Sequence, residues 1–257
     1  MTDLYLSRLR LPLRSRDTQR LLGDCHAMHR LVMSGFPEVS AGPARETLGV
    51  LYRVEEHPRA GVADVLVQSA SVPDWAAASR AIQVEGPRPL DPLLARIVAG
   101  ARFRFRLHAN PTRRVHERAT QMADTRPEPG RDGAPRRQYI EDARWKGKRV
   151  ELRREEDRLA WLARRGEAAG FRLAAVRLEP AGRDVPLARA DPAPSRRSGG
   201  CSTGQRSTSG DRLAFGIARF DGVLEVEDAE RLRAAIAAGI GPAKAFGCGL
   251  LSIAPVP

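Results

Sequence analysis

The sequence predicts an α+β protein, because segments that alternate like strands are interspersed with segments of helical periodicity in both halves of the chain. The first half shows the order strand, helix, strand, strand, helix, strand, and the second half repeats this rhythm. That order is typical of the split βαβ unit of ferredoxin-like, or RRM-like, domains. The chain has 257 residues, of which 42% are hydrophobic, so it is long enough for two such domains. We therefore predict tandem ferredoxin-like (βαββαβ) domains over residues 1–98 and 99–257.

The first half begins with a strand over residues 4–11, where apolar and polar side chains alternate. A single helix is expected over residues 16–33, and its buried face is formed by apolar residues at helical spacing. These residues are Leu21, Cys25, Met28 and Val32. The other elements expected here are strands at 48–54 and 65–69, a short helix near 75–81, and an extended segment marked by Pro87, Pro89 and Pro92.

The second half contains a strictly alternating strand at 102–108, which could either close the first domain or open the second. Its apolar face carries Phe103, Phe105 and Leu107, and its cationic face carries Arg102, Arg104, Arg106 and His108. A hairpin is expected over 215–226, turning at Asp221 and Gly222. The other expected elements are strands at 149–152, 171–178 and 250–253, a helix at 155–169, and a helix that is capped by Asp228 and ends at Gly239.

Two segments have the composition of flexible insertions. Residues 115–143 are rich in Arg, Pro, Gly and Asp, and residues 180–211 are of low complexity. Such compositions bury too little apolar surface to fold on their own. We expect both segments to be flexible in the free protein.

The charge of the chain favours a polyanionic partner. The formal net charge is +12, and each phosphate that a basic surface neutralises releases counterions. An arginine-rich genome would explain part of this charge, since Arg far outnumbers Lys, but it explains the net excess over acids less well. Nucleic acid is therefore favoured over a merely solvated basic surface.

The few cysteines and the lack of a long apolar segment predict a cytoplasmic protein. Cys25, Cys201 and Cys248 are few and far apart, which is typical of a reducing compartment. The N-terminus lacks the apolar stretch of a signal peptide, and no segment approaches the roughly 20 apolar residues that a membrane span needs. We expect no membrane partner.

The first candidate for chemistry is the pair His26 and His29, which lie three residues apart on the expected first helix. His29 flanks the apolar face, so its ring would be held at the edge of the core. Two imidazoles there could share proton transfers near neutral pH. For an isolated pair with this spacing, ordinary histidines at a polar edge are the commoner explanation. A metal site is weaker still, because no further His or Cys with suitable spacing supplies the remaining ligands.

The second candidate is the glycine-rich segment 239–249, which carries Lys244 at its centre. Its four glycines free the backbone to approach a ligand closely; they are Gly239, Gly241, Gly247 and Gly249. The segment lacks the Gly-Lys-Ser/Thr ending of a Walker A loop, and it follows a helix and leads into a strand, unlike a dinucleotide-binding loop. A loop that handles phosphate explains the glycines better than a tight turn with an incidental lysine.

The third candidate is a set of basic clusters in the second half. They are Arg113 and Arg114, Arg136 and Arg137, Lys146 with Lys148 and Arg149, Arg153 and Arg154, and Arg196 and Arg197. Each cluster alone is explained by a solvated surface. Their accumulation suggests a groove that follows a phosphate backbone.

Four blocks in this order resemble one known family over nearly the whole chain. They are the start MTDLYLSRL, the helix HAMHRL at 26–31, FRLHANPTRR at 105–114 and GIGPAKAFGCGLLSIAP at 239–255, of which the last is highly specific. The elements GKRVEL at 147–152 and AWLARR at 160–165 also fit. The sequence resembles the CasE family of CRISPR RNA-processing endoribonucleases, a branch of the repeat-associated RNA-binding superfamily. That resemblance also implies a tandem ferredoxin-like fold.

The resemblance implies that the chain binds a hairpin in CRISPR repeat RNA and cuts at its 3′ base, without a metal or other cofactor, by attack of the RNA's own 2′-hydroxyl. The family's catalytic histidine falls on His29. Family members often carry a tyrosine three residues earlier, where this chain has His26. The enzyme would then stay bound to its product as a subunit of the Cascade complex.

Within that mechanism, His29 would serve as general acid or base with His26 assisting, and Lys244 and the amides of the glycine-rich segment would hold the RNA backbone. The hairpin stem would be held by Arg113, Arg114, Lys148 and Arg149. Two other functions fit the same residues. One is a non-catalytic subunit that binds the hairpin in the same kind of complex, and the other is a metal-dependent nuclease that uses both histidines and carboxylates.

Overall fold

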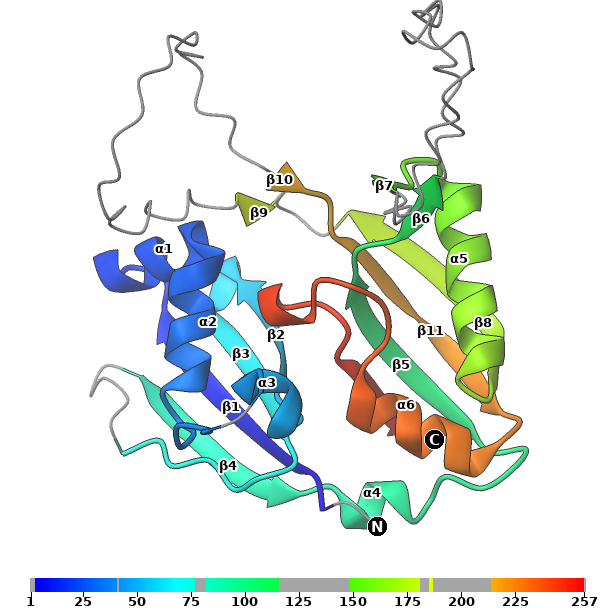
Figure 1. Cartoon of the computed structure of the whole chain (residues 1–257), viewed down its shortest axis with the longest axis horizontal. Helices are drawn as coiled ribbons and strands as arrows, with labels where there is room; N and C mark the ends of the chain where they lie inside the picture. The colour runs from blue at the N-terminus through cyan, green and yellow to red at the C-terminus, as the bar shows by residue number, and fades with distance from the viewer. Residues whose placement is uncertain are drawn as a thin grey trace, which may run out of the picture.

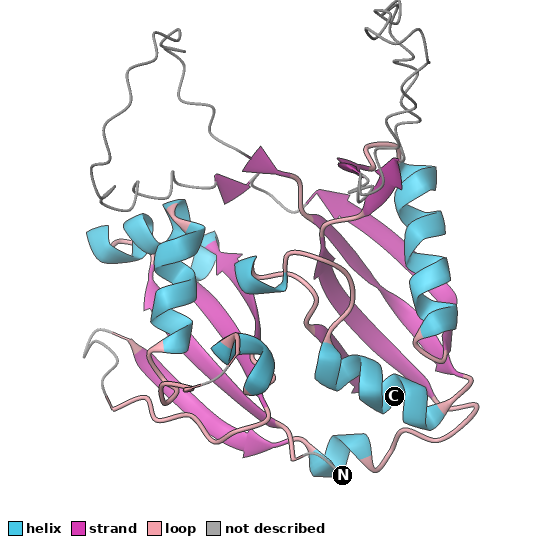
Figure 2. Ribbon diagram, in the orientation of Figure 1, coloured by secondary structure: helices cyan, strands magenta, loops and turns pink. Residues whose placement is uncertain are grey.

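The computed structural model describes residues 3–40, 42–76, 82–115, 148–180, 185–186 and 214–256. These residues form two four-stranded antiparallel sheets, and helices cover one face of each sheet (Figure 1, Figure 2). No helix in this part of the chain is long and apolar enough to cross a membrane. The α+β class predicted from the sequence is confirmed.

The first sheet has the strand order β2-β3-β1-β4. Its strands are β1 (Tyr5–Pro12), β2 (Leu51–His57), β3 (Val62–Ser69) and β4 (Gln83–Pro89). The helices that cover it are α1 (Arg16–Gly23), α2 (Cys25–Met33) and α3 (Ala44–Thr47). Alternate residues of β1 and β3 point toward these helices, so that Leu9 and Val65 pack with Met28 and Val32 in one core.

The second sheet has the strand order β12-β5-β11-β8. Its strands are β5 (Arg102–Ala109), β8 (Phe171–Pro180), β11 (Ala218–Val226) and β12 (Leu251–Pro255), and the helices that cover it are α5 (Glu155–Ala168) and α6 (Ala229–Ala238). Phe103, Phe105 and Leu107 are buried beneath these helices, as the alternation of the strand predicts. Counted in chain order, both sheets follow the order 4-1-3-2 of a ferredoxin-like domain, so the tandem fold is confirmed.

Seven short elements complete the described chain. They are η1 (Pro58–Ala60), α4 (Asp91–Leu94), β6 (Thr112–Val115), β7 (Lys148–Glu151), β9 (Val185–Pro186), β10 (Ala214–Phe215) and η2 (Lys244–Phe246). The first sheet ends at Pro89 and the second begins at Arg102. We retain the division 1–98 and 99–257 as a proposal that agrees with these limits.

The helix expected over residues 16–33 is two helices, because Asp24 interrupts it. Asp24 has an extended backbone, with φ −135° and ψ 104°, and its carboxylate accepts hydrogen bonds from the amides of His26 and Ala27. An aspartate in this role caps a new helix rather than continuing the old one. Helix α2 therefore starts at Cys25, and His26 lies in its first turn.

The prediction of a hairpin that turns at Asp221 and Gly222 is wrong, because both residues lie inside the continuous strand β11. Gly222 is needed there for close packing. A Cβ at this position would come within 2.1 Å of the carbonyl oxygen of Ala175 and 2.9 Å of the ring of Phe105. A glycine inside a strand can mark such a close approach instead of a turn.

Other differences lie around the strands of the first sheet. Helix α3 was not expected, and β2 accordingly starts at Leu51. The proline-marked segment pairs with β1 as the edge strand β4, so β5 opens the second domain. The helix expected near 75–81 lies outside the described residues from 77 onward, as do most of the expected insertions 115–143 and 180–211.

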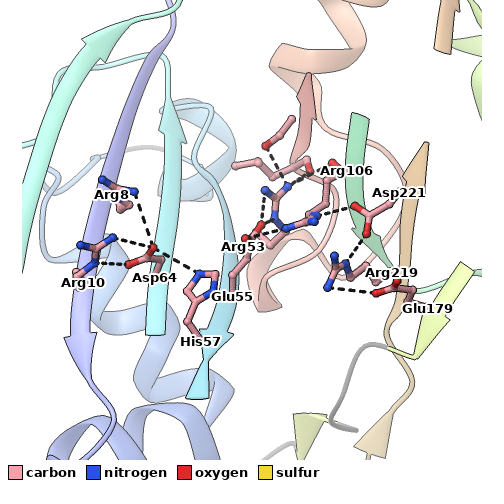
Figure 3. A network of polar contacts seen from close by, with 12 residues as sticks. Arg8, Arg10, Arg53, Glu55, His57, Asp64, Arg106, Glu179, Arg219 and Asp221 are labelled. Atoms are coloured by element: carbon pink, nitrogen blue, oxygen red, sulfur yellow. Dashed lines mark hydrogen bonds and ion pairs between the residues drawn. The ribbon is translucent and has the colours of Figure 1, made fainter. Parts of the chain in front are cut away.

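The two sheets are joined through Arg53 of β2, which is only 2% exposed (Figure 3). Its guanidinium pairs with Glu55, and it also donates to the carbonyl oxygens of Arg106 and Leu250, both at 3.3 Å, and to the hydroxyl of Ser252 at 3.0 Å. These three acceptors all belong to the second half of the chain. Glu55 also accepts from Arg106 at 3.0 Å, which adds an ion pair between the sheets.

We expect Arg53→Met to destabilise the protein by about 3–5 kcal/mol, as is typical when one partner of a buried ion pair is removed. The loss would leave Glu55 undercompensated and the acceptors on β5 and β12 without their donor. Urea unfolding followed by circular dichroism measures this free energy. The matched control is Arg102→Met, whose ion pair with Glu225 is at the surface and should contribute at most about 1 kcal/mol. Equal losses for the two variants would contradict this role of Arg53.

Candidate functional site

The structure brings together two of the sequence blocks that were singled out, the histidine pair and the glycine-rich segment. Helix α2 of the first half packs against η2 of the second half. The ring of His26 meets the ring of Phe246 edge to face, with centroids 5.4 Å apart. His26 and His29 are both half-buried, so each ring is held in place at the boundary between core and solvent.

The surroundings of His29 lower the pKa of its imidazole below the usual value near 6.5. Burial is the largest cause, followed by the electrostatic interactions with Arg45 and with His26, while the carbonyl of Ala245 acts in the opposite direction. Its buried Nδ1 has no hydrogen-bond partner among the described residues, which adds to the cost of placing a charge on the ring. The imidazole is therefore neutral near pH 7 and can accept a proton.

The glycines of the segment 239–249 allow the backbone to pack tightly against aromatic rings. All four have positive φ, between 77° and 91°. A Cβ on Gly241 would come within 2.9 Å of the ring of Trp161, and one on Gly247 within 3.3 Å of the ring of Tyr52. Side chains at these positions would therefore be strained or would push the turn away from Trp161 and Tyr52.

The backbone amides of this turn divide into two groups. The amide of Gly239 donates to Ala235 and that of Gly249 to His108, so both are used inside the fold. Gly241 is partly exposed and its amide makes no backbone hydrogen bond with the described residues, whereas Gly247 is buried. Of the four glycines, Gly241 is therefore the one whose amide an anion could reach.

Lys244 is tied to the end of helix α6. Its Nζ donates to the carbonyl oxygen of Ala238 at 2.7 Å, where the helix dipole is negative. Burial and the nearby charge of Arg45 lower the pKa of the ammonium group. An ammonium has three donors, so this bond leaves others for a phosphate.

Two residues that the sequence reasoning missed complete the site. The hydroxyl of Tyr52 donates to the carbonyl oxygen of Ala245 at 3.1 Å, which fixes the turn to β2, and burial raises the pKa of this phenol. Arg45 of α3 donates to the carbonyl oxygen of Val50 at 3.2 Å and pairs with Glu46 at 3.0 Å. Neither residue belongs to a recognisable motif.

A pocket of about 680 Å³ opens between α3 and the glycine-rich turn. The residues that carry its polar groups are Arg45 and Glu46 on one wall and Lys244 on the other. Ala245 lines the pocket too, and its carbonyl is the one that acts on His29. The pocket and the imidazole are therefore neighbours.

The structure places the other predicted cations away from the histidines. Arg113 and Arg114 are exposed on β6, which pairs with β7 to form a hairpin beside the start of α5 (Figure 1). In that hairpin, the backbone of Arg114 is opposite that of Arg149, and Val115 is opposite Lys148. The clusters 136–137 and 196–197, together with Lys146, lie outside the described residues. The hairpin is therefore a separate basic element from the site at α2.

The structure also bears on a possible metal site and on the cysteines. Among the residues that the structure describes, no three His, Cys, Asp or Glu side chains are grouped so that they could hold a metal ion. Cys25 and Cys248 are buried thiols, and burial raises the pKa of Cys248 to about 12. Cys201 lies outside the described residues.

Comparisons with known proteins agree on one family. The model of a family described as CRISPR associated protein matches residues 4–255. A CRISPR-associated endoribonuclease Cse3 from Thermus thermophilus is 34% identical over 98% of this chain and all of its own length. The CRISPR system Cascade subunit CasE of Escherichia coli is 29% identical over 91% of this chain and 93% of its own. The structure of Thermus thermophilus Cse3 bound to an RNA that represents a pre-cleavage complex matches with a TM-score of 0.68 and 30% identity, over 98% of this chain and 100% of that one.

We expect an NMR pH titration of the free protein to give His29 a pKa below 6.5. Arg45→Gln should raise that pKa, because removing a neighbouring positive charge favours the protonated imidazole. Arg59→Gln, which removes the same charge from the exposed element η1, is the control and should leave the titration unchanged. An equal pKa in wild type and Arg45→Gln would contradict this electrostatic coupling.

Proposed function

The chain belongs to the CasE family of CRISPR-associated endoribonucleases, and on this premise we propose that it cleaves CRISPR precursor RNA at the 3′ base of the repeat hairpin. The observation that carries the proposal is the neutral imidazole of His29 packed against the glycine-rich turn that bears Lys244. It combines a group that can move a proton near pH 7 with a cation and a backbone amide for a phosphate. These are the requirements of ribonucleotide cleavage without a protein nucleophile.

The proposed reaction starts with attack of the ribose 2′-hydroxyl on the adjacent phosphorus. The bond from phosphorus to the 5′ oxygen of the next nucleotide breaks, which gives a 2′,3′-cyclic phosphate and a 5′-hydroxyl. One proton leaves the 2′-hydroxyl, and one must reach the departing 5′ oxygen. His29 carries out one of these transfers, and His26, in the position where the family often has tyrosine, assists. Lys244 and the amide of Gly241 offset the charge on the phosphorane.

The hairpin stem requires a second contact surface. An A-form helix exposes phosphates and a deep, narrow groove, so proteins recognise it by shape and charge. The hairpin β6–β7 offers Arg113 and Arg114, and the backbone register adds Lys148 and Arg149 on the facing strand. We assign these four residues to the stem, at a distance from the scissile bond.

We also propose that the enzyme keeps its cleaved RNA and acts as a subunit of the Cascade surveillance complex in the cytoplasm. The Escherichia coli relative, whose name describes it as a Cascade subunit, supports this assembly. Two buried thiols agree with a reducing compartment. A non-catalytic role as hairpin-binding subunit is the alternative, and it needs no titrating imidazole.

We expect His29→Ala to slow single-turnover cleavage of a cognate repeat in EDTA by about 10²- to 10⁴-fold, the usual contribution of a general acid or base. Binding of the hairpin should remain, because the stem contacts lie elsewhere. Denaturing gels measure the rate and filter binding measures the affinity. Undiminished cleavage by the variant would reject the role of His29 as general acid or base. Loss of wild-type cleavage in EDTA, with recovery on adding a divalent ion, would favour a metal-dependent nuclease.

His26→Tyr tests whether an imidazole is required at that position. Tyrosine has a similar planar ring that can pack on Phe246 and a hydroxyl that can donate a hydrogen bond. We expect this variant to retain a rate within about 10-fold of wild type and His26→Ala to be slower, since a single hydrogen bond contributes about 1 kcal/mol. Collapse of the rate in His26→Tyr, with the fold intact by circular dichroism, would show that the imidazole itself is needed.

A further inference from the structure

The pocket between α3 and the glycine-rich turn has the size and charge of a ligand site, and the proposed reaction assigns no ligand to it. Its volume of about 680 Å³ lies within the range of small-molecule sites, about 300–1,000 Å³. Arg45 projects from the first half of the protein and Lys244 from the second. A pocket with a cation on each of two walls suits an anion that carries a larger apolar or aromatic group.

Arg45 is held rigidly enough to bind a ligand at a fixed position. Its side chain is 16% exposed, and its contacts with the carbonyl of Val50 and the carboxylate of Glu46 fix the guanidinium. These contacts use only part of a group that has five N–H donors. Its charge acts on both His29 and Lys244, since it lowers the pKa of each. Arg45 and Lys244 line the same pocket, and Ala245, whose carbonyl acts on His29, lines it too.

The direction of the RNA follows from where the stem contacts lie. The hairpin β6–β7 lies beside α5 in the second half, whereas α3 lies with α2 over the first sheet (Figure 1). For a cut at the 3′ base of the hairpin, the nucleotide on the 3′ side of the scissile phosphate lies beyond the stem, and the pocket lined by α3 and η2 lies beside the histidine site and not at β6–β7. The first nucleotide after the cut would then reach this pocket.

We propose that the pocket binds the nucleotide directly 3′ of the scissile phosphate, and that Arg45 binds a phosphate oxygen of that nucleotide opposite Lys244. This inference rests on the proposed function, because it takes the cleaved RNA as the ligand. Binding there fixes the leaving 5′ oxygen in line with the attacking 2′-hydroxyl, which raises the rate of cleavage without contributing to retention of the product. Glu46 acts as a positioning residue that holds the guanidinium.

The substrate provides a test that requires no variant. Wild-type protein is given two repeat hairpins that differ only at the first nucleotide after the cut, which is normal in one and abasic in the other. We expect the abasic RNA to be cleaved about 10-fold more slowly, because base stacking and contact contribute about 1–3 kcal/mol. Equal rates for the two RNAs would overturn the pocket proposal. Failure to cleave even the normal RNA would instead overturn the proposed function.

The variant Arg45→Gln tests the phosphate contact. It should slow cleavage of the normal RNA by about 10- to 100-fold, as expected for the loss of one hydrogen bond to a charged group. It should bind the product hairpin, which ends at the cut, as tightly as wild type does. Arg59→Gln, with the same loss of charge, is the control and should match wild type in both assays. Weakened product binding by Arg45→Gln alone would show that Arg45 serves the stem or the fold, and would reject the assignment.

A double-mutant cycle separates the pocket from a general effect on folding. If Arg45 and the downstream nucleotide share one site, removing the base should slow cleavage by Arg45→Gln less than it slows cleavage by wild type. Thermal unfolding of both proteins verifies that the fold is retained. Independent, multiplicative effects of the two changes would mean that the guanidinium and the downstream nucleotide do not meet.

Discussion

The buried guanidinium of Arg53 is the contact on which the arrangement of this protein depends. It extends from the first sheet and satisfies acceptors on two strands of the second, while Glu55 compensates its charge. Removing such a cation from water is unfavourable unless every donor is used, so the two sheets are held in one relative position. The adjacent residue on β2, Tyr52, then meets the glycine-rich turn. The geometry around His29 is thus a property of the contact between the two halves of the chain.

The electrostatics of the site favour the binding of a phosphate. Arg45 lowers the pKa of both His29 and Lys244, so the positive charges of Arg45 and Lys244 repel each other in the free protein. A bound phosphate would relieve this repulsion and raise the pKa of the imidazole. In the proposed mechanism, His29 therefore becomes a stronger base when the substrate arrives. The cations that act together with burial to lower the pKa of the imidazole in the free protein also attract the anion that it acts on.

Much of the fold could be predicted from local patterns, and the differences have physical causes. The alternation over 102–108 and the cap at Asp228 identify their elements, because burial and capping act over neighbouring residues. The sequence pattern wrongly predicts a helix through Asp24 and a turn at Gly222, because an Asp can either continue or cap a helix and a glycine can either form a turn or allow close packing. The histidines and the glycine-rich turn were found in the sequence as motifs. Arg45 and Tyr52 act through packing between distant segments, which no local pattern records.

The carbonyl oxygen of Ala245 has a consequence for how this family can diversify. It accepts the hydroxyl of Tyr52 and lies beside His29, so it couples a strand and a helix of the N-terminal half to a turn of the C-terminal half. A chimaera that exchanges one half between two relatives would pair this turn with a foreign tyrosine position and a foreign imidazole. Such halves should be compatible only when they are inherited together, even though each has the topology of a complete domain.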